Sequence, residues 1–254
     1  MVTRTPSNRS SLVGPSRRAG PASTVLRPSM LRPSGGLRWH MRALRYRECH
    51  RPFREQVASF LASWEPDTDD LVLVGPSAGW FLPVAFLTRF SRLLMIELDT
   101  SARFFFHCLH GRQLGRAGVS TRWLMEDFVI RLPEVLAARP KAAVLFCNVL
   151  GQLGLERADY HGELTALKER LVGRRWASFH DRFSAIGQSP RFREAAIFSA
   201  TSSMDAAMLS DLGCSGEWID HGTEAVFPDG TRRQIAAWSI TTSRLHFVEM
   251  GSVS

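Results

Sequence analysis

The sequence predicts an α/β protein with a Rossmann-like, doubly wound and mostly parallel sheet that ends in a C-terminal antiparallel hairpin. Short, fully apolar segments alternate with segments of helical periodicity, as in βαβ units. A turn of small residues follows the first apolar strand, where sheets of this kind approach their ligands. Two β-rich runs, 234–240 and 245–250, are separated only by a short turn, which indicates the hairpin.

The remaining elements are expected in a regular order along the chain. Residues 39–64 have apolar side chains at helical spacing and precede the first strand. The expected strands are 71–74, 93–98, 121–125, 142–148 and 176–179. The expected helices between them are 82–90, 102–114, 132–138 and 162–172. Strands that are apolar throughout are typical of a parallel sheet buried on both faces.

The net charge of +8 is concentrated at the N-terminus of the 254-residue chain. Residues 1–50 contain ten arginines, no lysine and one acid, Glu48, so residues 51–254 sum to only −1. The high isoelectric point is therefore poor support for nucleic-acid binding by the globular part. We divide the chain into a basic, Arg/Ser/Pro-rich tail at 1–38 and one domain at 39–254.

The tail is expected to be disordered, because it lacks acids and apolar periodicity and cannot bury enough surface to fold. Its composition is also compatible with a targeting segment, and Met30 and Met41 leave open an over-long start. The four cysteines form no C-x-x-C pair, and no His/Cys cluster has zinc-ligand spacing, so no metal is expected. No apolar run is long enough to span a membrane, and we expect a cytoplasmic protein.

The turn Gly75-Pro76-Ser77-Ala78-Gly79 has two interpretations. It fits G-x-S-x-G, the elbow of serine hydrolases, with Asp181 and either His221 or His246 as nominal partners of Ser77. It also fits a turn under a cofactor, followed by an acid that binds ribose hydroxyls about 20 residues later. Asp99 satisfies that spacing, whereas the earlier strands and oxyanion loop of a hydrolase are missing, so the cofactor interpretation is favoured.

Four ordered segments, VLVGPSAGW, IELDTSA, MEDF and LFCNVLGQL, resemble the signature segments of class I S-adenosylmethionine-dependent methyltransferases. The resemblance covers roughly residues 55–250, and that family also has a reversed last strand. It implies methyl transfer from S-adenosylmethionine to an unidentified small-molecule or protein acceptor.

The resemblance also implies roles for particular residues. Gly75, Ser77 and Gly79 would line the methionine side of the cofactor, and Ser77 would be a small spacer. Asp99 would bind the ribose hydroxyls. Asp127 would accept from the adenine amino group with Phe128 beside the ring, and Asn148 would lie near the methyl group.

Two further residues are candidates for catalysis, and three alternative functions stay open or fit less well. His180 and Asp181 follow the expected fifth strand, where a histidine could deprotonate the acceptor. Leu73 stands where the family usually has an acid, which leaves open a non-catalytic partner protein with the same fold. A serine hydrolase using Ser77 also stays open. A nicotinamide enzyme fits less well, because Ser77 and Trp80 occupy positions where its fingerprint needs glycine.

Overall fold

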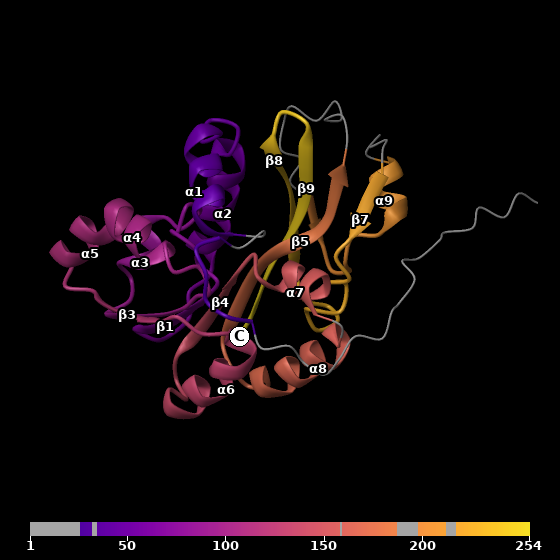
Figure 1. The fold of residues 1–254 in the computed structure, drawn as a ribbon. Helices are drawn as coiled ribbons and strands as arrows, with labels where there is room; N and C mark the ends of the chain where they lie inside the picture. The colour runs from indigo at the N-terminus through magenta and orange to yellow at the C-terminus, as the bar shows by residue number, and fades with distance from the viewer. Residues whose placement is uncertain (1–25, 32–34, 158, 187–197, 212–216) are drawn as a thin grey trace, which may run out of the picture.

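One mixed β-sheet organises the chain (Figure 1), in a computed structural model that describes residues 26–31, 35–157, 159–186, 198–211 and 217–254. The strand order is β3-β2-β1-β4-β5-β9-β8-β6, and β7 pairs with β5. The strands are β1 (Asp70–Val74), β2 (Arg92–Ile96), β3 (Ser120–Leu124), β4 (Ala143–Cys147), β5 (Trp176–Ile186), β6 (Phe198–Ala200), β7 (Glu217–Asp220), β8 (Arg233–Thr241) and β9 (Arg244–Val253). Strands β1 to β5 pair in parallel, and the later strands pair antiparallel. The chain has the predicted Rossmann-like fold with a reversed C-terminal hairpin.

Helices cover both faces of the parallel part. They are α1 (Gly36–Arg45), α2 (Arg51–Ser63), α3 (Val84–Leu87), α4 (Ala102–Phe106), a π-helical segment η1 (His107–Gly111), α5 (Arg112–Arg116), α6 (Phe128–Ala138), α7 (Leu150–Glu156), α8 (Tyr160–Leu171) and α9 (Ala206–Asp211). Apolar side chains of α2 to α5 form one core with the sheet, whereas those of α6 to α8 form a second core on the other face. Figure 1 shows α6 and α8 side by side below the sheet, with α1 and α2 away from them.

The central strand β1 shows why continuous apolar runs suit this architecture. All five of its residues are buried. Leu71 and Leu73 pack into the core with α2 to α5, whereas Val72 and Val74 pack into the core with α6 to α8. Because side chains alternate across a strand, both faces need apolar residues.

The ends of several elements differ from the sequence prediction. β2 ends at Ile96, two residues before the expected end, and β5 continues to Ile186 instead of stopping at Phe179. Helix α6 begins at Phe128 because Asp127 caps it, and its side chain accepts from Val129 N. Helix α7 was not predicted.

The N-terminal part of the described chain lies against the sheet. Helix α1 begins at Gly36, and Ser29 N donates to Leu98 O at 2.9 Å, so residues on the tail side of the proposed boundary contact the domain. The division at residue 38 stays a prediction, and the expected disorder of 1–25 and 32–34 lies outside the described residues. Across the described ranges, no helix is long and apolar enough to cross a membrane.

Candidate functional site

The strand order reverses between β1 and β4, and the candidate site lies at the carboxyl ends of these strands. In open α/β sheets, ligands bind in the crevice at this switch point. A cavity of about 790 Å³ opens there, a size typical of small-molecule sites. Its lining includes all but two of the predicted site residues, namely Gly75, Ser77, Asp99, Asp127, Phe128, Asn148 and Asp181. Gly79 and His180 are not part of the lining.

The turn after β1 has the strained backbone that its small residues permit. Gly75, Ser77 and Gly79 have φ angles of 64°, 51° and 70°, in the left-handed region. A Cβ on Gly75 would lie 2.9 Å from Val149 Cβ, so the turn also needs glycine for space. Ser77 N donates to Glu97 Oε2 at 2.7 Å, which joins the turn to the end of β2.

Within the described part of the chain, no catalytic base contacts Ser77. Its buried Oγ makes no hydrogen bond to any residue in the described ranges. A serine nucleophile needs a base within hydrogen-bonding reach. The geometry therefore does not support a hydrolase and fits a small spacer in the turn.

Glu97 is the site residue that the sequence analysis missed. It follows directly after β2, its carboxylate lines the cavity, and its Oε1 accepts from Leu98 N at 2.8 Å and Asp99 N at 2.9 Å. Burial raises the pKa of Glu97, and these backbone donors oppose the rise. Glu97 is the first carboxylate after the apolar run of β2, and this signal was available in the sequence. It was overlooked because the strand was expected to continue to Leu98.

The carboxylate of Asp99 accepts hydrogen bonds from other residues of the protein. Its Oδ2 accepts from Gly36 N at 3.0 Å and from His40 Nε2 at 2.8 Å, and its Oδ1 accepts from Ser101 N at 2.8 Å and Ser101 Oγ at 2.6 Å. Trp80 Nε1 donates to His40 Nδ1 at 3.0 Å, so the proton of His40 is on Nε2. Burial alone would raise the pKa of Asp99, but the hydrogen bonds from His40 and Ser101 outweigh it and lower the pKa. Asp99 therefore anchors α1 beside the cavity.

Asp127 follows β3 and also has several partners. Its Oδ1 accepts from Val129 N at 3.1 Å. Its Oδ2 accepts from Arg157 and, at 3.1 Å, from Leu26 N. Phe128 lies beside it in the cavity wall. A backbone N–H of the N-terminal segment thus occupies an acceptor site on Asp127.

Asn148 and Asp181 form a paired contact in a break of the sheet. Strand β4 pairs with β5 only as far as Phe179, and β7 begins pairing at Phe183. Between these points, Asn148 Oδ1 accepts from Asp181 N at 2.8 Å and Asn148 Nδ2 donates to Asp181 Oδ2 at 3.1 Å. Asn148 has a φ of 55°, which is uncommon for a residue other than glycine and clusters at functional sites.

A register shift in β5 determines which side chains reach the cavity. Phe179 and Asp181 line the cavity, two residues apart as in a regular strand. The pairing with β9 then shifts between Asp181 and Phe183. Beyond the shift, Ser184 lines the cavity and Phe183 packs in an apolar core, which reverses the earlier alternation.

The structure does not bring His180 to the site. Its ring is fully buried, its Nδ1 lies 2.9 Å from Ser178 Oγ, and its centroid lies 5.3 Å from that of Phe227. Burial lowers the pKa of His180 to about 3, despite the opposing charge of Asp181. A buried ring that does not line the cavity, and whose low pKa makes it a weak base, is poorly placed to take a proton from an acceptor there.

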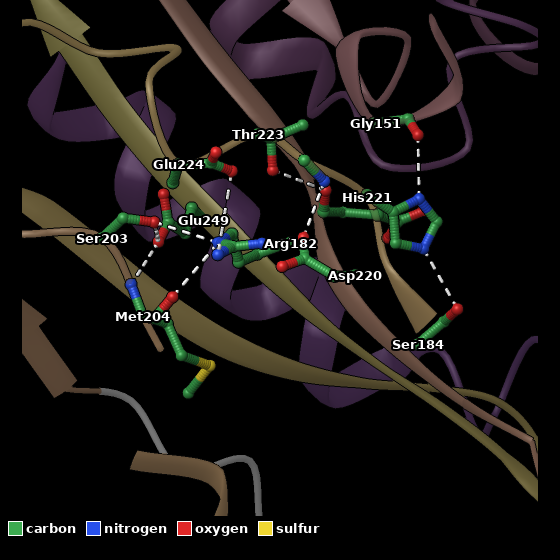
Figure 2. Close-up of polar contacts among 12 residues, drawn as sticks. Gly151, Arg182, Ser184, Ser203, Met204, Asp220, His221, Thr223, Glu224 and Glu249 are labelled. Carbon is green, nitrogen blue, oxygen red and sulfur yellow. Dashed lines mark hydrogen bonds and ion pairs between the residues drawn. The ribbon is translucent and has the colours of Figure 1, made fainter. Parts of the chain in front are cut away.

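Two other histidines stand beside Asp181. His221 lies between Gly151 and Ser184 (Figure 2), with Nδ1 2.8 Å from Gly151 O and Nε2 3.0 Å from Ser184 Oγ. His246, from β9, places Nδ1 3.0 Å from Asp181 Oδ1. Both line the cavity. The sequence suggested both as nominal hydrolase partners of Ser77.

Comparisons with known proteins were made by sequence and by structure. No protein-family model matches the sequence, and no curated protein matches it. Magnesium protoporphyrin IX methyltransferase (ChlM) from Synechocystis PCC 6803, solved with bound SAM, is 10% identical over 81% of this chain and 80% of that chain, with a TM-score of 0.40. N-methyltransferase NodS from Bradyrhizobium japonicum WM9 is 14% identical over 82% and 98% of the two chains, with a TM-score of 0.41. Likenesses at this level carry no argument about activity, and the fold follows from the strand order.

Proposed function

We propose that the protein transfers a methyl group from S-adenosylmethionine to an acceptor bound in the same cavity. The observation that carries this proposal is the meeting of the glycine-rich turn with the Glu97 carboxylate at the switch point of the sheet. The sequence resemblance to class I methyltransferases supports it. A sheet of five parallel strands that ends in a reversed hairpin is the arrangement that the resemblance implied.

The proposed ribose ligand is Glu97 and not Asp99. A carboxylate directly after β2 can accept hydrogen bonds from ribose hydroxyls. Glu97 retains acceptor capacity on Oε2, which accepts from Ser77 N, whereas its Oε1 already accepts from Leu98 N and Asp99 N. Asp99 already accepts four hydrogen bonds within the protein. Glu97 is also 20 residues after Ser77, so the expected spacing applies when it is counted from the middle of the turn.

The other roles follow from the positions around the cavity. Gly75, Ser77 and Gly79 would leave room for the methionine part of the cofactor. Phe128 and Asp127 would contact adenine, once Leu26 N has left Asp127. Asn148 would lie between the cofactor and the acceptor, next to Asp181.

The reaction needs little from the protein beyond alignment. Held by the turn after β1 and Glu97, S-adenosylmethionine would supply the methyl group: its carbon–sulfur bond would break as the methyl carbon bonds to the acceptor, and S-adenosylhomocysteine would leave. Holding both reactants in one cavity turns a bimolecular step into an effectively unimolecular one. His180 has no part in this proposal.

Calorimetric titration of the full chain with S-adenosylmethionine and S-adenosylhomocysteine tests the proposal. We expect micromolar binding that Glu97→Gln weakens by about tenfold or more, since a hydrogen bond to a charged group contributes about 1.5–3 kcal/mol. Glu126→Gln is the matched control, because Glu126 also lines the cavity but pairs with Arg131 of α6. A folded protein that binds neither compound would favour the non-catalytic alternative.

A further inference from the structure

Three potential metal ligands from different parts of the chain converge in the cavity wall. Asp181 comes from β5, His221 follows β7, and His246 comes from β9. Their candidate ligand atoms all lie within 4.8 Å of one another, and each residue is more than nine-tenths buried. Two ligands at about 2.1 Å from one ion are at most about 4.2 Å apart, so closing on an ion needs a shift below about 1 Å.

The cluster contains buried polar atoms that make no aligned hydrogen bond in the part of the chain that the structure describes. Asp181 Oδ1 and His246 Nδ1 lie 3.0 Å apart, yet neither makes an aligned hydrogen bond within the described ranges. His246 Nε2 also lacks a partner there. Buried polar groups are nearly always hydrogen-bonded, and a bound ion is one of the accepted reasons for an exception. A carboxylate oxygen and an imidazole nitrogen 3.0 Å apart have the spacing of neighbouring ligands of one cation.

Outer contacts already hold two of the three ligands in place. The Nδ1–H of His221 donates to Gly151 O at 2.8 Å (Figure 2), which makes its Nε2 an acceptor. Ser184 Oγ contacts this Nε2 at 3.0 Å and would give up the contact to a bound ion. Asn148 Nδ2 donates to Asp181 Oδ2 at 3.1 Å and leaves Oδ1 available. Ligating histidines and carboxylates in metal sites have this kind of outer partner, which fixes tautomer and orientation.

We propose that Asp181, His221 and His246 bind one divalent transition-metal cation. Two imidazoles and one carboxylate suit Zn²⁺, Fe²⁺ or Co²⁺, whereas Mg²⁺ and Ca²⁺ favour sites made only of oxygen ligands. Three protein ligands leave coordination positions open, and the cluster borders the cavity, so those positions face a bound ligand. Sequence spacing did not predict this site, because its ligands lie on separate strands and a loop. The proposal does not depend on methyl transfer, since metal uptake is measured without cofactor or acceptor.

Cobalt titration of the full, untagged chain after chelator treatment tests the site. We expect one equivalent of Co²⁺ to bind with visible ligand-field bands, Zn²⁺ to displace it, and Mg²⁺ to leave the bands unchanged. His246→Ala and Asp181→Asn should each weaken Co²⁺ binding by more than a hundredfold. Asn148→Ala, which removes an outer contact, should weaken it by about tenfold to a hundredfold.

The control variant is His161→Ala, which removes an exposed histidine of α8 and should bind Co²⁺ as the wild type does. Circular dichroism checks that each variant is folded, and the wild-type titration decides the matter if a variant is not. Absence of stoichiometric Co²⁺ and Zn²⁺ binding by the wild type would overturn the proposal. Unchanged binding in both His246→Ala and Asp181→Asn would overturn it as well, because the metal would then bind elsewhere.

Discussion

Gly79 and Gly118 have the same backbone conformation in different surroundings, which allows the packing of the turn after β1 to be measured. Both have a φ of 70°. A Cβ on Gly79 would lie 2.8 Å from His110 Nε2 and 3.0 Å from Phe106 Cε2, whereas a Cβ on Gly118 would meet no heavy atom within 4 Å. Alanine at the two positions therefore separates backbone strain from steric overlap.

The expected losses of stability follow from these surroundings. Alanine in the left-handed region costs roughly 1–2 kcal/mol, and this applies to both glycines. At Gly79 the buried rings of His110 and Phe106 must also move, and such overpacking adds about 1–3 kcal/mol. The hydrogen bond between His110 Nε2 and Gly79 O, at 3.1 Å, limits that movement. We expect Gly79→Ala to lose about 2–5 kcal/mol and Gly118→Ala about 1–2 kcal/mol.

Urea denaturation followed by circular dichroism measures both values, provided that the m-values agree. Adding His110→Ala to Gly79→Ala should cost less than the two single losses together, since it removes one of the overlapping rings. Equal losses for Gly79→Ala and Gly118→Ala would refute the reasoning, because they would show that the rings impose no constraint on the turn.

Three further predictions concern the contacts around the cavity. Asp99→Asn should lower the free energy of unfolding, measured by urea denaturation, by about 1–3 kcal/mol. Calorimetry should show that it weakens cofactor binding less than Glu97→Gln does. If Asp99→Asn weakened cofactor binding more, the ribose role would return to Asp99. Leu26→Pro removes the N–H that donates to Asp127 and should tighten cofactor binding threefold to tenfold (about 1 kcal/mol). Leu26→Ala keeps this N–H and should leave the affinity for the cofactor unchanged. Equal cofactor affinities in the two variants would contradict this reasoning. Burial lowers the pKa of His50 below 6.5 in the folded protein. As pH falls below 6.5, His50 is therefore protonated in the unfolded chain before it is protonated in the folded one. The free energy of unfolding then falls by about 1.4 kcal/mol per pH unit until His50 of the folded protein is protonated as well. Urea midpoints at pH 7 and 5.5 should therefore differ less in His50→Gln, and an identical difference would contradict the assignment.

The central strands of the parallel half could be predicted because they are apolar on both faces. Each of the first four strands agreed within two residues at either end. Strands β1, β2 and β4 are buried almost throughout, whereas β3 is a mostly exposed edge strand. The expectation of continuous apolar residues did not predict most of β5. Its second half contains Arg182, whose buried guanidinium contacts Asp220 and Glu224 and accounts for a charge within a strand (Figure 2). Sequence alone does not show that such a charge has partners 38 or more residues away.

The candidate site could be predicted only where a short local pattern defines it. The turn at Gly75–Gly79 and the residues after β3 and β4 line the cavity or its border, because a turn or a strand end is visible in a few neighbouring residues. The sequence analysis assigned the ribose role to Asp99, whereas we propose Glu97, two residues earlier, because β2 ends at Ile96 and not at Leu98. His221 and His246 approach Asp181 only after β5, β7 and β9 pair, so no local spacing could identify the cluster.

The register shift in β5 fixes the number of residues that the strand must have between the cavity-facing side chains of its two halves. Before it, odd-numbered residues such as Asp181 face the cavity, and after it Ser184 does, while Phe183 faces an apolar core. Deleting one residue at the shift would restore strict alternation, but the side chains of one half of the strand would then point to the opposite face of the sheet. Either Asp181 would leave the cavity or Phe183 would leave its core. Natural variants of this chain should therefore show insertions and deletions in the loops around β5 and a constant number of residues between Asp181 and Ser184.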